Sequence, residues 1–148
     1  MSDRTYPVIL DHVNGVIDAI KGGAFPLEFL VEEWRRPVDP NERYIDPPYA
    51  LVRPMPSAAQ FTGPIDDTQA DIILRIQVLA VGDTQSQALR VGDLCRARMQ
   101  RRFITIPYRR VMDVRFMVTT GGLSRDDDLP TPTFYSADIY ELQTTPTT

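Results

Sequence analysis

The chain has 148 residues, 43% of them hydrophobic and 24% charged, which is the composition of an ordinary folded domain and not of a disordered or fibrous protein. Its formal net charge of −4 argues against a dedicated nucleic-acid-binding protein, because such proteins usually present a basic footprint. No apolar run approaches the roughly 18 residues of a membrane-spanning helix, and the opening MSDRTYP does not have the pattern of a signal peptide. We therefore expect one domain over 1–148, frayed at 1–5 and 144–148, with no membrane association.

An amphipathic helix is predicted between Pro7, which suits the first position of a helix, and Gly22-Gly23, which suits a helix end. An apolar stripe lies opposite Asp and Asn side chains in this segment, so the helix should cover one face of a sheet. His12 lies at the edge of the stripe, where a histidine is more often a boundary residue than a ligand or a catalytic base. The stripe consists of Ile9, Val13, Val16, Ile17 and Ile20.

Two strands are predicted next, because residues 25–35 and 49–53 are rich in strand-forming side chains. Proline and turn residues in PVDPNERYIDPP, between these strands, favour irregular structure. The segment MPSAAQFTGPIDDTQ, after the second strand, is expected to be a second irregular link. Both links should therefore lie outside the sheet.

The segment 70–103 predicts a long strand followed by a long helix. In the strand, apolar side chains at every second position should face the core, while the opposite face mixes apolar and polar side chains and should be half covered. The set that should be buried consists of Ile72, Leu74, Ile76, Val78 and Ala80.

A capping box marks the start of the helix. Gly82 and Asp83 end the strand, and Thr84 with Gln87 forms the T-x-x-Q pattern that satisfies free N–H groups at a helix N-terminus. The single cysteine, Cys95, excludes a disulfide within the chain and is expected to be a small core residue. The helix face that should be buried consists of Ala88, Val91, Gly92, Cys95, Met99 and Phe103.

Two further strands are predicted over 111–119 and 134–142, with 104–110 as a connector and 120–133 as a long loop. The expected order is helix, strand, strand, strand, helix, strand, strand. Consecutive strands with two helices indicate an α+β fold, in which a mostly antiparallel sheet of about five strands is covered by the helices. One face of the first of these two strands should carry Met112, Val114, Phe116 and Val118.

The common motifs of catalysis and cofactor binding are missing: the sequence has no phosphate-binding glycine loop, no C-x-x-C, no H-E-x-x-H and no G-x-S-x-G. One histidine and one cysteine are too few for a zinc site of such ligands within the chain. Asp126, Asp127 and Asp128 have the oxygen ligands that Ca²⁺ and Mg²⁺ prefer, but adjacent acids in a loop are usually solvated. We expect no catalytic, cofactor-binding or metal-binding residues; a small metal-dependent enzyme or ligand-binding domain using these aspartates is a remote alternative.

Arginines on the second helix are the best candidates for an interface. Arg90, Arg98 and Arg101 flank the apolar Leu94 on one side of the helix. Interfaces favour arginine around an apolar centre, so this arginine cluster is a candidate contact to a neighbouring subunit. The alternative is a solvated helix face whose arginines bury only their aliphatic stems.

Charge around this helix suits an acidic partner. The pairs Arg101-Arg102 and Arg109-Arg110 add local positive charge, which fits an acidic neighbour as well as the phosphates of DNA. The aspartates Asp126–Asp128, on a loop long enough to reach outward, are the candidate negative counterpart. We therefore predict that one or both surfaces contact another subunit or another assembly component.

The order and spacing of the elements resemble tail terminator (tail-completion) proteins of long-tailed, non-contractile bacteriophages. The resemblance is carried by VLAVGDTQSQAL at the start of the second helix, by YALVRPMP, and by the closing strand FYSADIYEL. The Gly-Pro and acidic loop before the long strand also fits, and the resemblance extends over 6–143.

The resemblance implies a structural virion protein and not an enzyme. Members of this family form a hexameric ring on the last ring of the tail tube, which stops tube polymerisation and presents a surface to the head-side connector protein. The implied partners are further copies of the chain, the major tail tube protein and that connector, while DNA passes through the ring without sequence-specific binding. The implied location is the head-proximal end of the virion tail, after assembly in the host cytoplasm, with no cofactor.

Besides the metal-dependent enzyme or ligand-binding domain, two alternatives remain open at this point. The first is another head–tail joining or tail tube protein of the same virion, because related folds recur there. The second, from a different class, is a DNA-binding factor, which the acidic balance of the chain disfavours.

Overall fold

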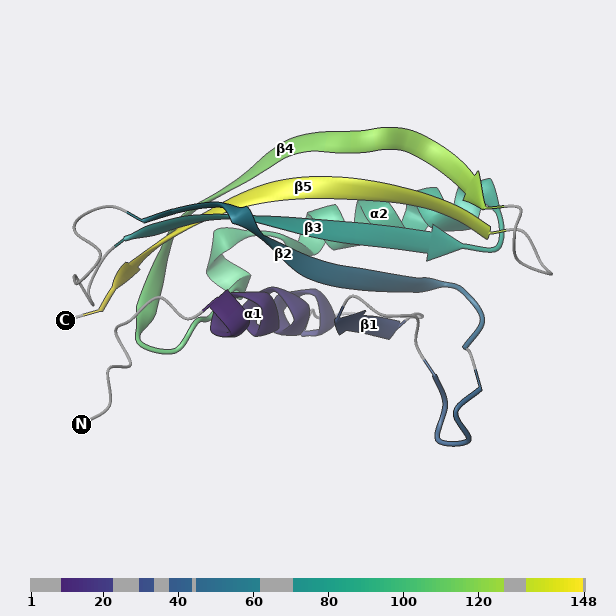
Figure 1. Cartoon of the computed structure of the whole chain (residues 1–148), viewed down its shortest axis with the longest axis horizontal. Helices are drawn as coiled ribbons and strands as arrows, with labels where there is room; N and C mark the ends of the chain where they lie inside the picture. Colours follow the sequence, from purple (N-terminus) through teal and green to yellow (C-terminus); the bar gives the residue numbers. More distant parts are fainter. Residues whose placement is uncertain are drawn as a thin grey trace.

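The computed structural model describes residues 9–22, 30–33, 38–43, 45–61, 71–126 and 133–147. Two helices lie against a five-stranded sheet, so the predicted α+β class and the order of elements are confirmed (Figure 1). The elements are α1 (Ile9–Lys21), β1 (Leu30–Glu33), β2 (Tyr49–Phe61), β3 (Ile72–Gly82), α2 (Gln85–Arg98), the 3-10 turn η1 (Arg101–Phe103), β4 (Arg109–Asp126) and β5 (Thr133–Pro146).

The strand order in the sheet is β1-β2-β3-β5-β4, which places β1 and β4 at opposite edges. Among the described strands, β1 and β2 pair in parallel and the other three pairings are antiparallel. The long strand β3 is central, and the last strand in the chain, β5, lies between it and β4. The sheet is therefore mostly antiparallel, as predicted.

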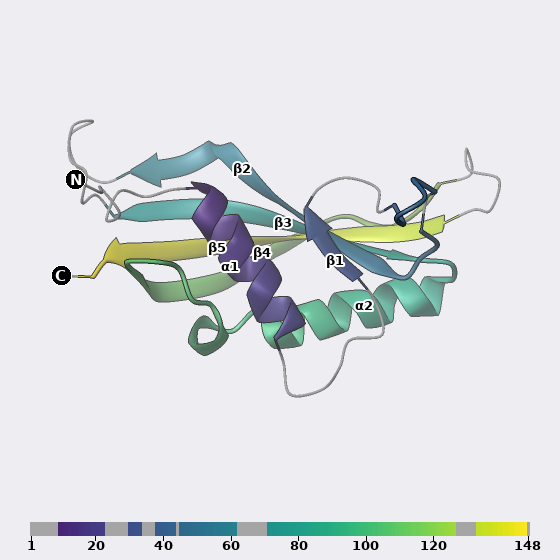
Figure 2. The ribbon, with the colours of Figure 1, turned by 90° about the horizontal axis from the view of Figure 1, so that it is seen from below.

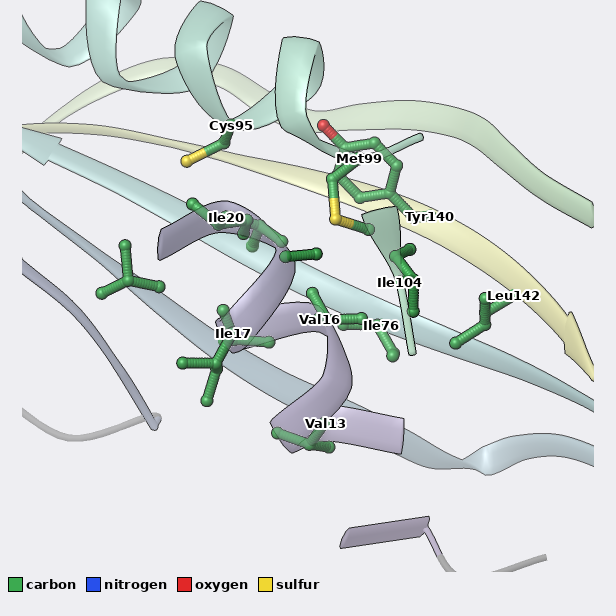
Figure 3. Packing of buried hydrophobic residues seen from close by; sticks show 14 of the residues in the cluster. Val13, Val16, Ile17, Ile20, Ile76, Cys95, Met99, Ile104, Tyr140 and Leu142 are labelled. Atoms are coloured by element: carbon green, nitrogen blue, oxygen red, sulfur yellow. The ribbon is translucent and has the colours of Figure 1, made fainter. Parts of the chain in front are cut away.

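Both helices pack on the same face of the sheet (Figure 2). Side chains at every second position of β3 point to this face and are buried, as the alternating pattern predicts. Figure 3 shows Val16 of α1 next to Ile76 of β3 and Ile20 of α1 near Cys95 of α2; Leu142 of β5 belongs to the same buried cluster and lies further along it. On the opposite face of β3, three side chains are half-buried and Gln77 and Val81 are buried, so this second face is partly covered, as predicted.

The junction between β3 and α2 is formed by the predicted capping box. The hydroxyl of Thr84 accepts a hydrogen bond from the N–H of Gln87, at 3.1 Å. The side chain of Gln87 reaches back and accepts from the N–H of Asp83, at 2.6 Å, one residue earlier than in the usual motif. A side chain at Gly82 would approach the backbone nitrogen of Ala88 to 2.4 Å, so this sharp turn requires glycine.

The second helix ends earlier than the sequence predicts. It stops at Arg98, and the backbone at Met99 turns out of the helix at φ −84° and ψ 57°. Phe103 was expected on the buried helix face, but it lies on η1, half-exposed, with the Arg102 guanidinium 4.6 Å from its ring centre. The prediction for Phe103 was wrong because helical periodicity was extended through a segment that the chain uses to turn into β4.

The second strand continues well into the segment that was expected to be an irregular link. Met55 pairs with Arg75 and Phe61 pairs with Ile72, with a register shift between these positions. The prolines did not end the strand because β1 accompanies β2 only as far as Val52. Beyond that residue β3 is the only described neighbour of β2, and proline is tolerated at such edge positions.

The hairpin of β4 and β5 is also longer than predicted. The expected loop over 120–133 is largely strand, because β4 continues to Asp126 and β5 starts at Thr133. Register shifts interrupt this hairpin in three places, and each adds residues on β4 that have no single partner on β5. Such irregularities break the alternation on which the prediction of strand ends depended.

Thr144, expected to belong to a frayed end, is fully buried near the end of β5. Its hydroxyl lies 2.8 Å from Nε2 of His12 and accepts a hydrogen bond from Nε of Arg109 at 2.9 Å. His12, expected at the boundary of the α1 stripe, is therefore a buried residue with a polar partner across the core. The N–H of Thr147 donates to the Tyr108 carbonyl, at 3.0 Å, which extends the ordered region almost to the end of the chain.

Candidate assembly surface

The predicted arginine cluster on α2 is divided in the structure. Arg90 is exposed and Leu94 is half-buried. Arg98, in contrast, is only 9% exposed, and its Nη1 donates to the carbonyl of Ile20 at 3.0 Å. Arg98 therefore joins α2 to the C-terminal end of α1 through this hydrogen bond. The prediction that it flanks Leu94 on an exposed surface was wrong.

Arg101 is also separated from Leu94, because α2 has ended before it. It lies on η1 and donates from Nη1 to the carbonyl of Met112 on β4, at 3.1 Å. Of the predicted acidic counterpart, Asp126 ends β4, where its backbone pairs with Thr133. Its side chain, and all of Asp127 and Asp128, lie outside the described residues, so a role for these aspartates stays a prediction.

An ion pair connects α2 to β5 under the helix. Nε of Arg96 donates to Oδ2 of Asp138 at 2.9 Å, and its Nη1 donates to Oδ1 of Asp93 at 2.8 Å. Asp138 is 3% exposed, whereas the Arg96 side chain is 37% exposed. The hydrogen bond that Arg96 donates to Asp138 raises the pKa of Arg96, so this guanidinium keeps its charge.

Two further ionisable groups lie beside this pair. Burial, and then the negative charge of Asp138, raise the pKa of the Cys95 thiol to about 12, so Cys95 is a protonated core residue at neutral pH. The same two causes raise the pKa of Tyr140 well above its ordinary range.

In the described part of the chain, no three His, Cys, Asp or Glu side chains are grouped as they would be around a metal ion. No helix among the described residues has the length and apolar character needed to cross a membrane.

Exposed apolar side chains gather on the edge strand β4. Phe116 is 50%, Met117 is 42% and Val118 is 48% exposed, and we call these three residues the β4 apolar strip. Phe116 lies edge-on to Tyr140 with ring centres 5.7 Å apart, on the helix side of the sheet. A register shift at Met117 turns Val118 to the opposite face, where it pairs with Ile139. Val118 was therefore wrongly predicted to share a face with Phe116.

Four arginines line a hollow formed by η1 and the start of β4. They are Arg101, Arg102, Arg109 and Arg110, and the hollow has a volume of about 720 Å³. The side chain of Arg109 is fixed in the wall of the hollow by two hydrogen bonds. Its Nε donates to the hydroxyl of Thr144 and its Nη2 donates to the carbonyl of Thr144. Burial lowers the pKa of Arg109 from its ordinary value, which is high enough that the side chain stays charged. We call this region the basic hollow.

The sequence contained a signal for both of these surfaces but not for the ion pair. Phe116, Met117 and Val118 are three consecutive apolar residues, and such a run cannot be buried on a single face of a strand. The local charge of Arg101-Arg102 and Arg109-Arg110 was visible in the sequence, and the fold brings both pairs to the same hollow. The pairing of Arg96 with Asp138 depends on how α2 crosses β5, which neither segment encodes alone.

No protein-family model matches the sequence, and no curated protein matches it either. Among solved structures, the chain is similar to one in the virion of a native gene transfer agent (GTA) particle. The match has a TM-score of 0.55 and 12% sequence identity, and it covers 88% of this chain and 84% of that chain. The likeness shows a shared fold over almost the whole of both chains.

Proposed function

We propose that this chain is a structural virion protein that forms a ring on the end of a phage-type tail tube. The ring stops polymerisation of the tube and provides the surface to which the head-side connector attaches. Its partners are further copies of the chain, as a hexamer, together with the major tail tube protein and the connector. The protein acts at the head-proximal end of the tail, after assembly in the host cytoplasm, and DNA passes through the ring without sequence-specific contacts.

The observation that carries this proposal is the likeness to a chain of the GTA virion, which covers both chains almost completely. The element order and the segments VLAVGDTQSQAL and YALVRPMP, which resemble tail terminator proteins, favour the tail-capping role within the virion.

The surface chemistry supports a role in assembly. The β4 apolar strip exposes three large side chains on a sheet edge, and clustered exposed apolar residues usually mark a protein contact. The two side chains most often used for catalysis, His12 and Cys95, are buried and serve the core. We therefore propose a non-enzymatic role that needs no cofactor.

Electron microscopy of particles made without this gene tests the tail-capping role. A ring that stops polymerisation predicts tails of uncontrolled length in its absence. Tails of normal length detached from filled heads would identify a head–tail joining protein and contradict the capping role. Failure to form any tube would indicate a tube protein.

A second experiment tests whether the β4 apolar strip takes part in capping. Met117→Lys should leave the chain folded, because this side chain is already largely exposed, but should prevent binding to isolated tail tubes. The matched control is Leu89→Lys, at an exposed apolar position on α2 that lies outside the strip. Equal tube binding by both variants would remove the strip from the proposal.

A further inference from the structure

An acidic hollow lies between α1 and β1, on the edge of the sheet opposite β4. Asp18, Glu32 and Glu33 line it together with Lys21, and its volume is about 360 Å³. It shares no lining residue with the basic hollow. A third hollow, between α1 and the segment 103–107, lies between them and shares Asp18 with the acidic hollow and Thr105 with the basic hollow.

Arg101, Arg102 and Arg110 of the basic hollow, and Asp18, Glu32 and Glu33 of the acidic hollow, take no part in the ion pairs of the described part of the chain. Ion pairs found there join Arg75 to Glu141, Arg96 to Asp93 and Asp138, and Arg115 to Asp113. None of these involves a residue of either hollow. The three carboxylates and the exposed arginines of the hollows are therefore available to a second molecule.

We infer that the basic hollow of one copy of this chain receives the acidic α1–β1 edge of the next copy. A ring of identical chains that each carry a net charge of −4 repels itself unless opposite charges meet at every contact. Two different surfaces that complement each other give a head-to-tail contact, which is the type that closes into a ring. This inference rests on the proposed ring and assigns its contact to Arg101, Arg102 and Arg110 on one side and to Asp18, Glu32 and Glu33 on the other.

The other chemistry that fits clustered arginines is the phosphate backbone of DNA. A second copy of the chain is the favoured occupant of the basic hollow, because the acidic hollow gives every copy a complementary surface of carboxylates. The phosphates of DNA would be repelled by these carboxylates and gain nothing from them. The experiments below separate the two occupants.

Disulfide trapping tests the contact directly. A chain carrying Arg102→Cys and Glu33→Cys, mildly oxidised at high concentration, should form a ladder of covalent multimers that ends at a closed ring. The native Cys95 does not interfere, because it is buried and protonated. Each single variant should stop at a small amount of dimer, and Arg90→Cys with Glu33→Cys should give no ladder. Absence of the ladder from the first chain would overturn the inference.

Charge reversal provides the second test. Arg102→Glu and Glu33→Arg should each abolish self-association, since like charges then meet at every contact. An equal mixture of the two should associate again, because each variant then offers the surface that the other lacks. Arg90→Glu, which changes the net charge by the same amount outside the hollow, should associate like the wild type. If Arg102→Glu instead abolishes binding to a short DNA duplex and the mixture does not recover association, the hollow binds DNA.

The two proposals fail in different ways. If the wild type forms multimers in sedimentation but the cysteine chain gives no ladder, the ring stands and the assigned contact is wrong. If the wild type forms no multimer, alone or on isolated tubes, the proposed ring itself fails.

Discussion

At the start of α2, Thr84 and Gln87 hold the helix N-terminus through one side-chain-to-backbone bond each. Thr84→Ala should lower the free energy of unfolding by about 0.5–2 kcal/mol, because a helix N–H loses its partner. Chemical denaturation measures this change. The matched control is Ser86→Ala, which removes an exposed hydroxyl that caps nothing. A loss of similar size in the control would show that the effect does not come from the cap.

The raised pKa of Cys95 leads us to expect that the free energy of unfolding falls as the pH rises above about 9. Its pKa is about 12 in the folded chain against an ordinary value of 9.0, so between these values only the unfolded chain has released the proton. Unfolding then releases a proton, and stability that is complete below pH 9 should fall by up to about 1.4 kcal/mol per pH unit above it. Urea denaturation between pH 8 and 10 measures this slope.

The variant Cys95→Ala isolates that contribution. It should be less stable at pH 8, because a buried sulfur is lost, but should lose stability less steeply as the pH rises. Tyr140 has a raised pKa as well and retains its own contribution in both proteins at higher pH. Equal slopes for the two proteins between pH 8 and 10 would contradict the assignment to Cys95.

At the scale of elements, the Arg96–Asp138 pair joins α2 to β5, and its two members should respond differently to mutation. Arg96→Met leaves the carboxylate of Asp138 buried without its charged partner, which should cost about 3 kcal/mol. Asp138→Asn should cost about 1 kcal/mol, because Arg96 is partly exposed and keeps Asp93. Denaturation of both variants and of the double variant measures the coupling between them. A larger loss for Asp138→Asn would contradict this explanation.

The elements that could be predicted from the sequence are those with a local cause. The alternation in β3, the apolar stripe of α1 and the Thr84–Gln87 cap each depend on residues a few positions apart. Strand ends were mispredicted where pairing between distant segments decides them, as in β2 beyond Val52 and β4 beyond 120. The burial of His12 likewise depends on Thr144, which is 132 positions away.

The candidate surfaces follow the same division. The arginine pairs and the apolar run at Phe116 are local patterns that the sequence displays. Their grouping into the basic hollow and the β4 apolar strip depends on where α2 stops and where β4 shifts register. Arg101 was wrongly grouped with Leu94 for this reason, since α2 ends before it, whereas Arg98 is on α2 but is buried against the carbonyl of Ile20.

For the whole molecule, we expect a monomer or weak oligomer in dilute solution that forms a ring on its partner. Six copies of the 16.8 kDa chain would weigh about 101 kDa, and closed cyclic symmetry is the general expectation for identical subunits. Light scattering across a concentration series, with and without isolated tail tubes, measures the mass. A stable dimer at every concentration would contradict a head-to-tail ring.

The position of β5 between β3 and β4 has a consequence for the order in which the chain can fold. β4 is made before β5 and pairs with no other described strand, so it has no place in the sheet until β5 is available. The half of the sheet formed by β1, β2 and β3 can pair earlier, with α2 already packed on β3. Because β5 then pairs with β3 and β4 at once, the burial of Thr144 and the completion of the basic hollow belong to the same late step. A partly folded chain would therefore carry its acidic edge before its basic one, and copies could not join until each had finished folding.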